Sequence, residues 1–177
     1  MGWAIGGCTA LAAAVSLWRL ADSWVLALFL GLAVVAAVLA WIDLTQRRLP
    51  NRLVLPALVV SVPLLLGAAL LDGDPGAWLT ALGGGAALFA LYLVLALVSP
   101  RGMGMGDVKL AALVGLYAGF LGWPALVIAA FAGFLLGGLA ALGAIVSGRA
   151  TRSTSIPFGP WMLAGLWVSV ALTPVVT

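Results

Sequence analysis

Residues 102–109 read Gly-Met-Gly-Met-Gly-Asp-Val-Lys, and an apolar run, LAALVGLYAGF, follows them directly. The glycines of this stretch deliver an aspartate, Asp107, and a lysine, Lys109, to the start of the apolar run. The chain has only five acidic residues among 177, and an acid at the edge of a membrane segment calls for a functional explanation. We expect its partner to be Asp43, which ends an earlier apolar segment.

The composition places the chain among integral membrane proteins. It is 65% hydrophobic and 7% charged, and it has no histidine and no glutamate. Soluble domains usually carry about 25% charged residues. Most side chains must therefore face the lipid bilayer or another apolar helix. The net charge of +3 is spread over short loops and forms no basic patch, so no nucleic-acid partner is predicted.

The apolar stretches have lengths near the ~20 residues that a helix needs to cross a bilayer. They show no alternation of period two, which excludes a barrel and favours an all-α bundle of about seven transmembrane helices. Small residues at 83–87 and at 133, 137 and 138 would let these helices pack closely. No linker is long enough to separate domains, so residues 1–177 are predicted to form one membrane domain. The expected segments are 2–18, 24–42, 53–71, 77–98, 108–122, 125–147 and 157–177.

The basic residues predict the orientation of the bundle. Every lysine and arginine except Arg19 lies in three loops, and these loops fall on one side if all seven segments span. Basic loops stay in the cytoplasm, so that side is predicted to be cytoplasmic. Asp43 and Asp107 then lie at the same, cytoplasmic face. The basic residues of that side are Arg47, Arg48, Arg52, Arg101, Lys109, Arg149 and Arg152, and the other side has Arg19, Asp22, Asp72 and Asp74.

Two adjacent carboxyl groups are suited to peptide hydrolysis without a metal or a cofactor. One acts as a base toward water, and the other, protonated, acts as an acid toward the carbonyl group. Because both resist ionising together, they share a proton, and the resulting apparent pKa values belong to the pair. We assign Asp43 and Asp107 jointly as catalytic and leave open which one starts protonated. With no histidine and a single cysteine, the common catalytic triads and cysteine zinc sites are excluded.

Three motifs resemble those of type IV prepilin peptidases, in the same order. Asp43-Leu-Thr-Gln-Arg-Arg-Leu49-Pro50-Asn51 is similar to the first aspartate motif of that family. Gly104-Met-Gly-Asp107 is similar to its Gly-x-Gly-Asp motif, and Ile156-Pro-Phe-Gly-Pro160 to its Pro-Phe-Gly-Pro element. The resemblance covers about residues 35–177, which would make the first segment an additional N-terminal helix.

The resemblance implies a multi-pass protein of the inner membrane that cuts leader peptides at the cytoplasmic face. Its substrates would be prepilins or pseudopilins, which have a short basic leader followed by an apolar helix, and no oligomeric state is implied. Many members also methylate the new amino terminus, through a cytoplasmic insertion that often has paired zinc-binding cysteines. Only Arg19 to Ser23 separate the first two segments here, and the cysteine pairs are missing. Methyltransferase activity is therefore not expected.

Structural roles are the alternatives for these residues. Asp43 would cap a helix or pair with Arg47 or Arg48, and Asp107 would sit favourably at a positive helix start. Gly104 and Gly106 are expected to let the backbone approach substrate and to let Asp107 move, whereas Gly102 is left open. Lys109 would either tune the acid pair or simply follow the bias of basic residues to the cytoplasm.

Three other functions compete with this interpretation. Presenilin-type proteases also use Gly-x-Gly-Asp, but Ile42 here precedes the first acid where they have tyrosine. Archaeal preflagellin peptidases share the chemistry and the topology. A small ion-coupled transporter would more often bury its acids near the middle of the membrane, whereas Asp43 and Asp107 lie at the ends of segments.

Overall fold

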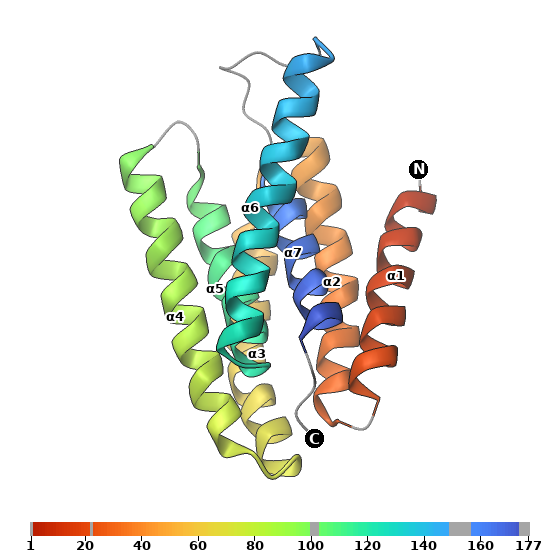
Figure 1. Cartoon of the computed structure of the whole chain (residues 1–177), viewed down its shortest axis with the longest axis vertical. Coiled ribbons are helices and arrows are strands. Elements are labelled where there is room, and N and C mark those ends of the chain that lie inside the picture. The colour runs from red at the N-terminus through yellow and green to blue at the C-terminus, as the bar shows by residue number, and fades with distance from the viewer. Residues whose placement is uncertain (1, 22, 100–102, 149–156, 174–177) are drawn as a thin grey trace.

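The computed structural model is a bundle of helices with no strand in the residues that it describes, which are 2–21, 23–99, 103–148 and 157–173 (Figure 1). The helices of this part of the chain are α1 (Gly2–Leu20), α2 (Val25–Gln46), α3 (Asn51–Leu71), α4 (Pro75–Val98), α5 (Met105–Phe120), α6 (Trp123–Val146) and α7 (Gly159–Leu172).

The helices confirm the all-α membrane prediction and change some of its boundaries. Each expected segment overlaps one helix. The fifth was expected at 108–122 but begins at Met105, so Asp107 belongs to its first turn. The seventh was expected at 157–177, but α7 begins only at Gly159 and ends at Leu172, and residues 174–177 lie outside the described part. By length and composition, α2, α3, α4 and α6 are sufficient to cross a membrane, and α7 is a shorter apolar helix.

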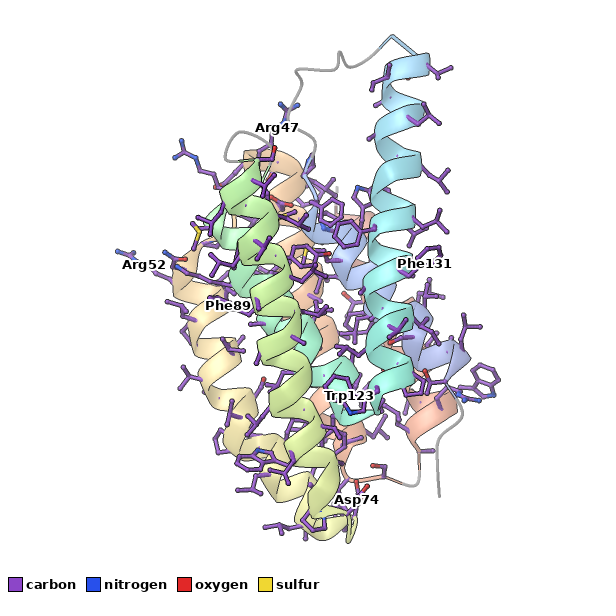
Figure 2. All side chains as sticks on the ribbon, turned by 60° about the vertical axis from the view of Figure 1, so that its left-hand side comes forward. Arg47, Arg52, Asp74, Phe89, Trp123 and Phe131 are labelled. Atoms are coloured by element: carbon purple, nitrogen blue, oxygen red, sulfur yellow. The ribbon has the colours of Figure 1, made fainter. Side chains whose placement is uncertain are left out.

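Consecutive helices alternate in direction, so their ends gather at two faces of the bundle (Figure 1). Arg47, at the end of α2, and Asp74, before α4, mark the two opposite ends in Figure 2. The chain turns sharply at both. Arg47 adopts a left-handed conformation with φ of 51°, and the Asp74 side chain accepts a hydrogen bond from the backbone N–H of Ala77. The ends of α2 and α4 and the starts of α3, α5 and α7 thus share one face.

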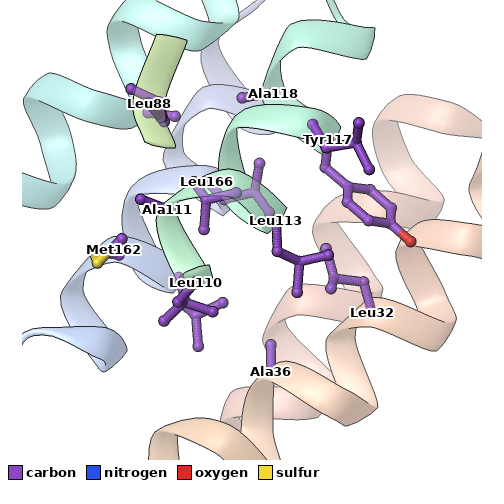
Figure 3. Packing of buried hydrophobic residues seen from close by; sticks show 14 of the residues in the cluster. Leu32, Ala36, Leu88, Leu110, Ala111, Leu113, Tyr117, Ala118, Met162 and Leu166 are labelled. Carbon is purple, nitrogen blue, oxygen red and sulfur yellow. The ribbon is translucent and has the colours of Figure 1, made fainter. Parts of the chain in front are cut away.

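Helix α5 is the centre of the bundle. Its residues from Leu110 to Gly119 are all buried, and it packs against α3, α4, α6 and α7 (Figure 3). A helix that is apolar all round is suited to this position, because it has no polar face that needs water. With 16 residues, α5 is also shorter than the helices around it, except α7. The acid at its start therefore lies at the edge of a buried element.

Glycines hold α4 and α5 in backbone contact. A Cβ atom added at Gly84 would lie 2.5 Å from the carbonyl oxygen of Gly115, and one added at Gly119 would lie 2.5 Å from that of Thr80. Gly85 likewise faces Ala112, at 3.3 Å. Small residues at such contacts let membrane helices approach until their backbones touch. The expected packing role of the 83–87 stretch is confirmed at Gly84 and Gly85.

A second close pair is formed by α6 and α7. A Cβ at Gly165 would lie 2.5 Å from the carbonyl oxygen of Ala129, and one at Gly133 would meet the Met162 backbone at 3.3 Å. Gly137 gives room to the ring of Phe158, which a Cβ would approach to 2.5 Å. The packing prediction fails at Gly138, where a Cβ would have nothing within 4 Å, and at Ala86 and Ala87, which are exposed.

Replacing Gly84 by alanine should destabilise the bundle, because the new methyl group meets backbone that cannot rotate away. Overpacking of this kind typically costs about 1–3 kcal/mol. Unfolding in detergent micelles with increasing dodecyl sulfate would measure the loss. The matched control is Gly67→Ala on α3, where the added Cβ meets nothing within 4 Å. Equal stability of the two variants would contradict the proposed contact.

Candidate functional site

Asp43 lies three residues before the end of α2 and is buried, with 4% of its surface exposed. Its carboxyl group is bound by a backbone group of another helix. The N–H of Gly159, the first residue of α7, donates a hydrogen bond of 3.0 Å to Asp43 Oδ2. This contact joins residues 116 positions apart in the sequence. A buried carboxyl group needs such a partner, because losing water without compensation is costly.

Gly159 is the point where three helices meet. A Cβ at this position would lie 2.8 Å from Asp43 Oδ2 and 3.3 Å from Leu110 Cδ2 of α5. Only glycine therefore fits between α2 and α5 without displacing the acid. Helix α7 packs against both α2 and α5. The start of α7 thus links the helices that carry the two aspartates.

Asp107 is in the first turn of α5, where its side chain folds back over the helix start. The N–H of Gly104 donates a hydrogen bond of 3.1 Å to Asp107 Oδ2. This is the position at which an acid satisfies a free backbone donor and complements the helix dipole. The helix-start role considered for Asp107 is therefore present in the structure.

The two aspartates lie at the same face of the bundle, Asp43 near the end of α2 and Asp107 in the first turn of α5. Gly159 of α7 lies against Asp43 and against Leu110, which is about one turn along α5 from Asp107. Each carboxyl group has its Oδ2 atom bound to a backbone N–H, that of Gly159 or that of Gly104. Acid–base chemistry by a carboxyl pair needs both groups at one face, and two carboxyl groups that come close can hold one proton between them.

The other residues of the glycine stretch contact the loop between α2 and α3. A Cβ at Gly106 would lie 2.9 Å from Leu49 Cβ, so Gly106 lets this loop pack against the start of α5. Lys109 donates a hydrogen bond of 3.0 Å from Nζ to Asn51 Oδ1, and Asn51 is the first residue of α3. Both contacts join the chain after Asp43 to the chain around Asp107. Gly102 lies outside the described residues.

The side chain of Asp43 neither caps its own helix nor pairs with Arg47 or Arg48, the two alternatives considered for it. Its backbone carbonyl accepts a hydrogen bond from the N–H of Arg47, as at an ordinary helix end. Its side chain is bound to Gly159, and the side chains of Arg47 and Arg48 are exposed. In the described part of the chain, neither arginine forms a hydrogen bond or an ion pair with the carboxyl group of Asp43.

Sequence reasoning missed two groups at this site. The first is the Gly159 N–H, whose motif was noted only for its resemblance and was given no role. The second is Tyr92 of α4, which the register of α4 against α5 places beside the first turn of α5. Its ring contacts Phe158, the residue before Gly159, with ring centroids 6.1 Å apart. A tyrosine within an apolar helix was the only signal, and such residues are often no more than core aromatics.

Comparisons with known proteins agree with the motifs. The type IV leader peptidase family matches residues 30–142. A prepilin leader peptidase/N-methyltransferase of Aeromonas hydrophila is 35% identical over 92% of the chain and 55% of its own length. The protein of that name from Bacillus subtilis is 33% identical over 77% of the chain and 51% of its own length. No solved structure matches the chain.

The chain spans about half the length of the curated relatives that it matches. Within that span, the family match includes Asp43 and Asp107 together with the helices that bring them to one face. From the matched sequence, we conclude that this chain belongs to the type IV leader peptidase family.

Proposed function

We propose that the chain is a membrane aspartyl endopeptidase that cuts the leader peptide from type IV prepilins or pseudopilins. The observation that carries the proposal is that the fold brings Asp43 and Asp107 to one end of an apolar bundle. Membership of a leader peptidase family supports the reaction class. The relatives reported above are named as prepilin peptidases, which favours prepilins over preflagellins as substrates.

In the proposed reaction, the ionised member of the pair takes a proton from water as the water oxygen attacks the scissile carbonyl carbon. The protonated member gives its proton to the carbonyl oxygen, which yields a neutral tetrahedral intermediate. The C–N bond then breaks as the now protonated carboxyl group gives its proton to the leaving nitrogen and the ionised carboxylate takes a proton from one hydroxyl group of the intermediate, which yields an acid and an amine and restores the pair. The backbone N–H groups of Gly159 and Gly104 each hold one Oδ2 atom. The Oδ1 atoms are then available to water and substrate.

Loop residues near the pair would contact the leader. We propose that Gly104 and Gly106 leave the backbone at the start of α5 accessible to an extended peptide. Lys109 would act indirectly, since its bond to Asn51 fixes the α2–α3 loop beside the site. The apolar helix that follows the leader would remain in the bilayer against the bundle.

We place the site at the cytoplasmic face of the inner membrane. Arg47, Arg48, Arg52 and Lys109 belong to the face where α2 ends and where α3 and α5 begin. The opposite face has the acids Asp72 and Asp74. An excess of basic residues is typical of cytoplasmic loops.

Removing either carboxyl charge should abolish cleavage. In Asp43→Asn and in Asp107→Asn, the pair loses a group that transfers a proton, so we expect cleavage to fall by at least about a hundredfold in each. The measurement is the appearance of mature pilin from a prepilin in membranes, with the level and insertion of each variant determined in parallel. Asp74→Asn, at the opposite end of the bundle, is the matched control. Normal cleavage by either site variant would refute the carboxyl pair.

Replacing Gly159 by alanine should impair cleavage while the bundle stays folded. The added Cβ would stand 2.8 Å from Asp43 Oδ2 and push the acid from its place. Displacements of about 1 Å at a catalytic group can cost on the order of a hundredfold in rate. Gly138→Ala on α6, whose Cβ meets nothing within 4 Å, is the control. The rates of prepilin cleavage should separate the two variants, and equal rates would show that Gly159 does not position Asp43.

The proposal covers hydrolysis and not methyl transfer. Helix α1 ends at Leu20 and α2 begins at Val25, which leaves no room between them for a folded insertion. We therefore expect pilin cleaved in the presence of S-adenosylmethionine to keep the mass of the unmodified product. Mass spectrometry of the mature amino terminus would detect a methyl group, and its presence would refute this part of the proposal.

A further inference from the structure

We propose that Tyr92 is a positioning residue of the aspartate pair, and that its hydroxyl group donates a hydrogen bond to the carboxylate when Asp107 ionises. In the structure the Asp107 side chain is bound to the N–H of Gly104 and not yet to Tyr92. This inference rests on the proposed function, because it assigns a role in the same reaction. Tyr92 would orient the carboxyl group of Asp107 in the first turn of α5, and it would not touch the substrate.

The register of α4 against α5 places Tyr92 beside Asp107. The two helices run in opposite directions, and Gly85 faces Ala112 and Leu116. Moving seven residues forward along α4, from Gly85 to Tyr92, corresponds to moving about seven residues back along α5. That step reaches about residues 105–109, the turn that contains Asp107.

The direction of the side chain follows from the helix period. Seven residues are close to two turns, so Tyr92 lies on the same face of α4 as Gly85. Gly85 is in contact with α5. Tyr92 accordingly points toward α5 and is buried, with 1% of its surface exposed.

Aromatic neighbours fix the ring of Tyr92. Phe134 of α6 stacks on it with a centroid distance of 5.2 Å and an interplanar angle of 23°. Phe158 lies 6.1 Å away by centroid and also contacts Phe134, at 5.4 Å. Phe158 directly precedes Gly159, whose N–H binds Asp43. The ring of Tyr92 therefore packs against the residue next to the backbone group that holds Asp43. Such packing holds a phenol at low entropic cost.

The charged groups around the hydroxyl leave Asp107 as its natural acceptor. Helices α6 and α7 have no acidic or basic residue, and they contribute Phe134 and Phe158. Of the other charged residues on the packed elements, Lys109 of α5 is bound to Asn51, and Arg52 of α3 is exposed. Asp43 of α2 is bound to the N–H of Gly159 through its Oδ2 atom. The Tyr92 hydroxyl forms no hydrogen bond to another residue of the described part of the chain, so it is free to donate one to Asp107.

The proposed hydrogen bond would favour the ionised form of Asp107. A hydrogen bond given to a carboxylate stabilises the charged form and is stronger than one between neutral groups. Without it, Asp107 would ionise only at higher pH. The rate of any step that needs the ionised acid, or needs it in one orientation, would fall.

The test is Tyr92→Phe, which keeps the ring between Phe134 and Phe158 and removes only the hydroxyl. We expect kcat for prepilin cleavage to fall on the order of tenfold with KM nearly unchanged, because the lost bond is one to a charged group. The acid limb of the pH–rate profile should move to higher pH by about half a unit to one unit. The infrared band of the Asp107 carboxyl group, isolated by subtracting the spectrum of Asp107→Asn, should titrate at a correspondingly higher pH. This measurement requires no turnover.

Tyr117→Phe is the matched control. This substitution also removes a buried hydroxyl group, which is hydrogen-bonded to Ser61 at 3.0 Å. Tyr117, however, lies ten residues along α5 from Asp107. At 1.5 Å per residue this is about 15 Å from the site. The control should keep the rate and the pH profile of the parent.

Tyr92→Leu separates packing from hydrogen bonding. If Tyr92→Phe behaves as the parent in rate, pH profile and infrared band while Tyr92→Leu fails, the ring serves packing alone and the inference is overturned. In that case inactive Asp43→Asn and Asp107→Asn variants would leave the proposed function intact. Normal cleavage by the aspartate variants would instead refute the function, and the infrared comparison would still decide the Tyr92 bond.

Discussion

The contact between the backbones of α4 and α5 is the constraint on which this site depends. Because Gly84 and Gly115 lack side chains, the two helices meet at a distance that no other residue pair would allow at these positions. The contact fixes how deeply α5 lies in the bundle and which residues of α4 stand beside it. A short, buried α5 can then present its first turn, with Asp107, at one face of the molecule.

A third helix, α7, connects the two helices that carry the acids. Helix α7 packs against both α2 and α5, and its first residue occupies the space beside Asp43. One oxygen of each carboxyl group is bound to a backbone N–H, which restrains the acid without adding a charge. Neutral donors suit a pair that is proposed to share one proton, because a nearby cation would favour ionising both members.

The sequence was sufficient for the helices and for the prediction that both acids lie at one face, since both follow from the length of apolar runs and from their order. Gly159 and Tyr92 could not be assigned roles in the same way. Gly159 is 116 residues from Asp43, and Tyr92 reaches Asp107 only through the register of two packed helices. Such contacts depend on the shapes of distant surfaces, which no local pattern contains. Lys109 illustrates the same limit, because its partner Asn51 is 58 positions away.

The hydrogen bond from Gly159 to Asp43 also affects how this chain tolerates mutation. The donor belongs to the peptide backbone, so no exchange of one side chain for another deletes it, except exchange to proline. An alanine scan would record the steric effect of a methyl group at this position and would not reveal the amide as a functional group. Replacing that single amide by an ester, through chemical synthesis or an α-hydroxy acid, would remove the donor and leave the shape of the site almost unchanged.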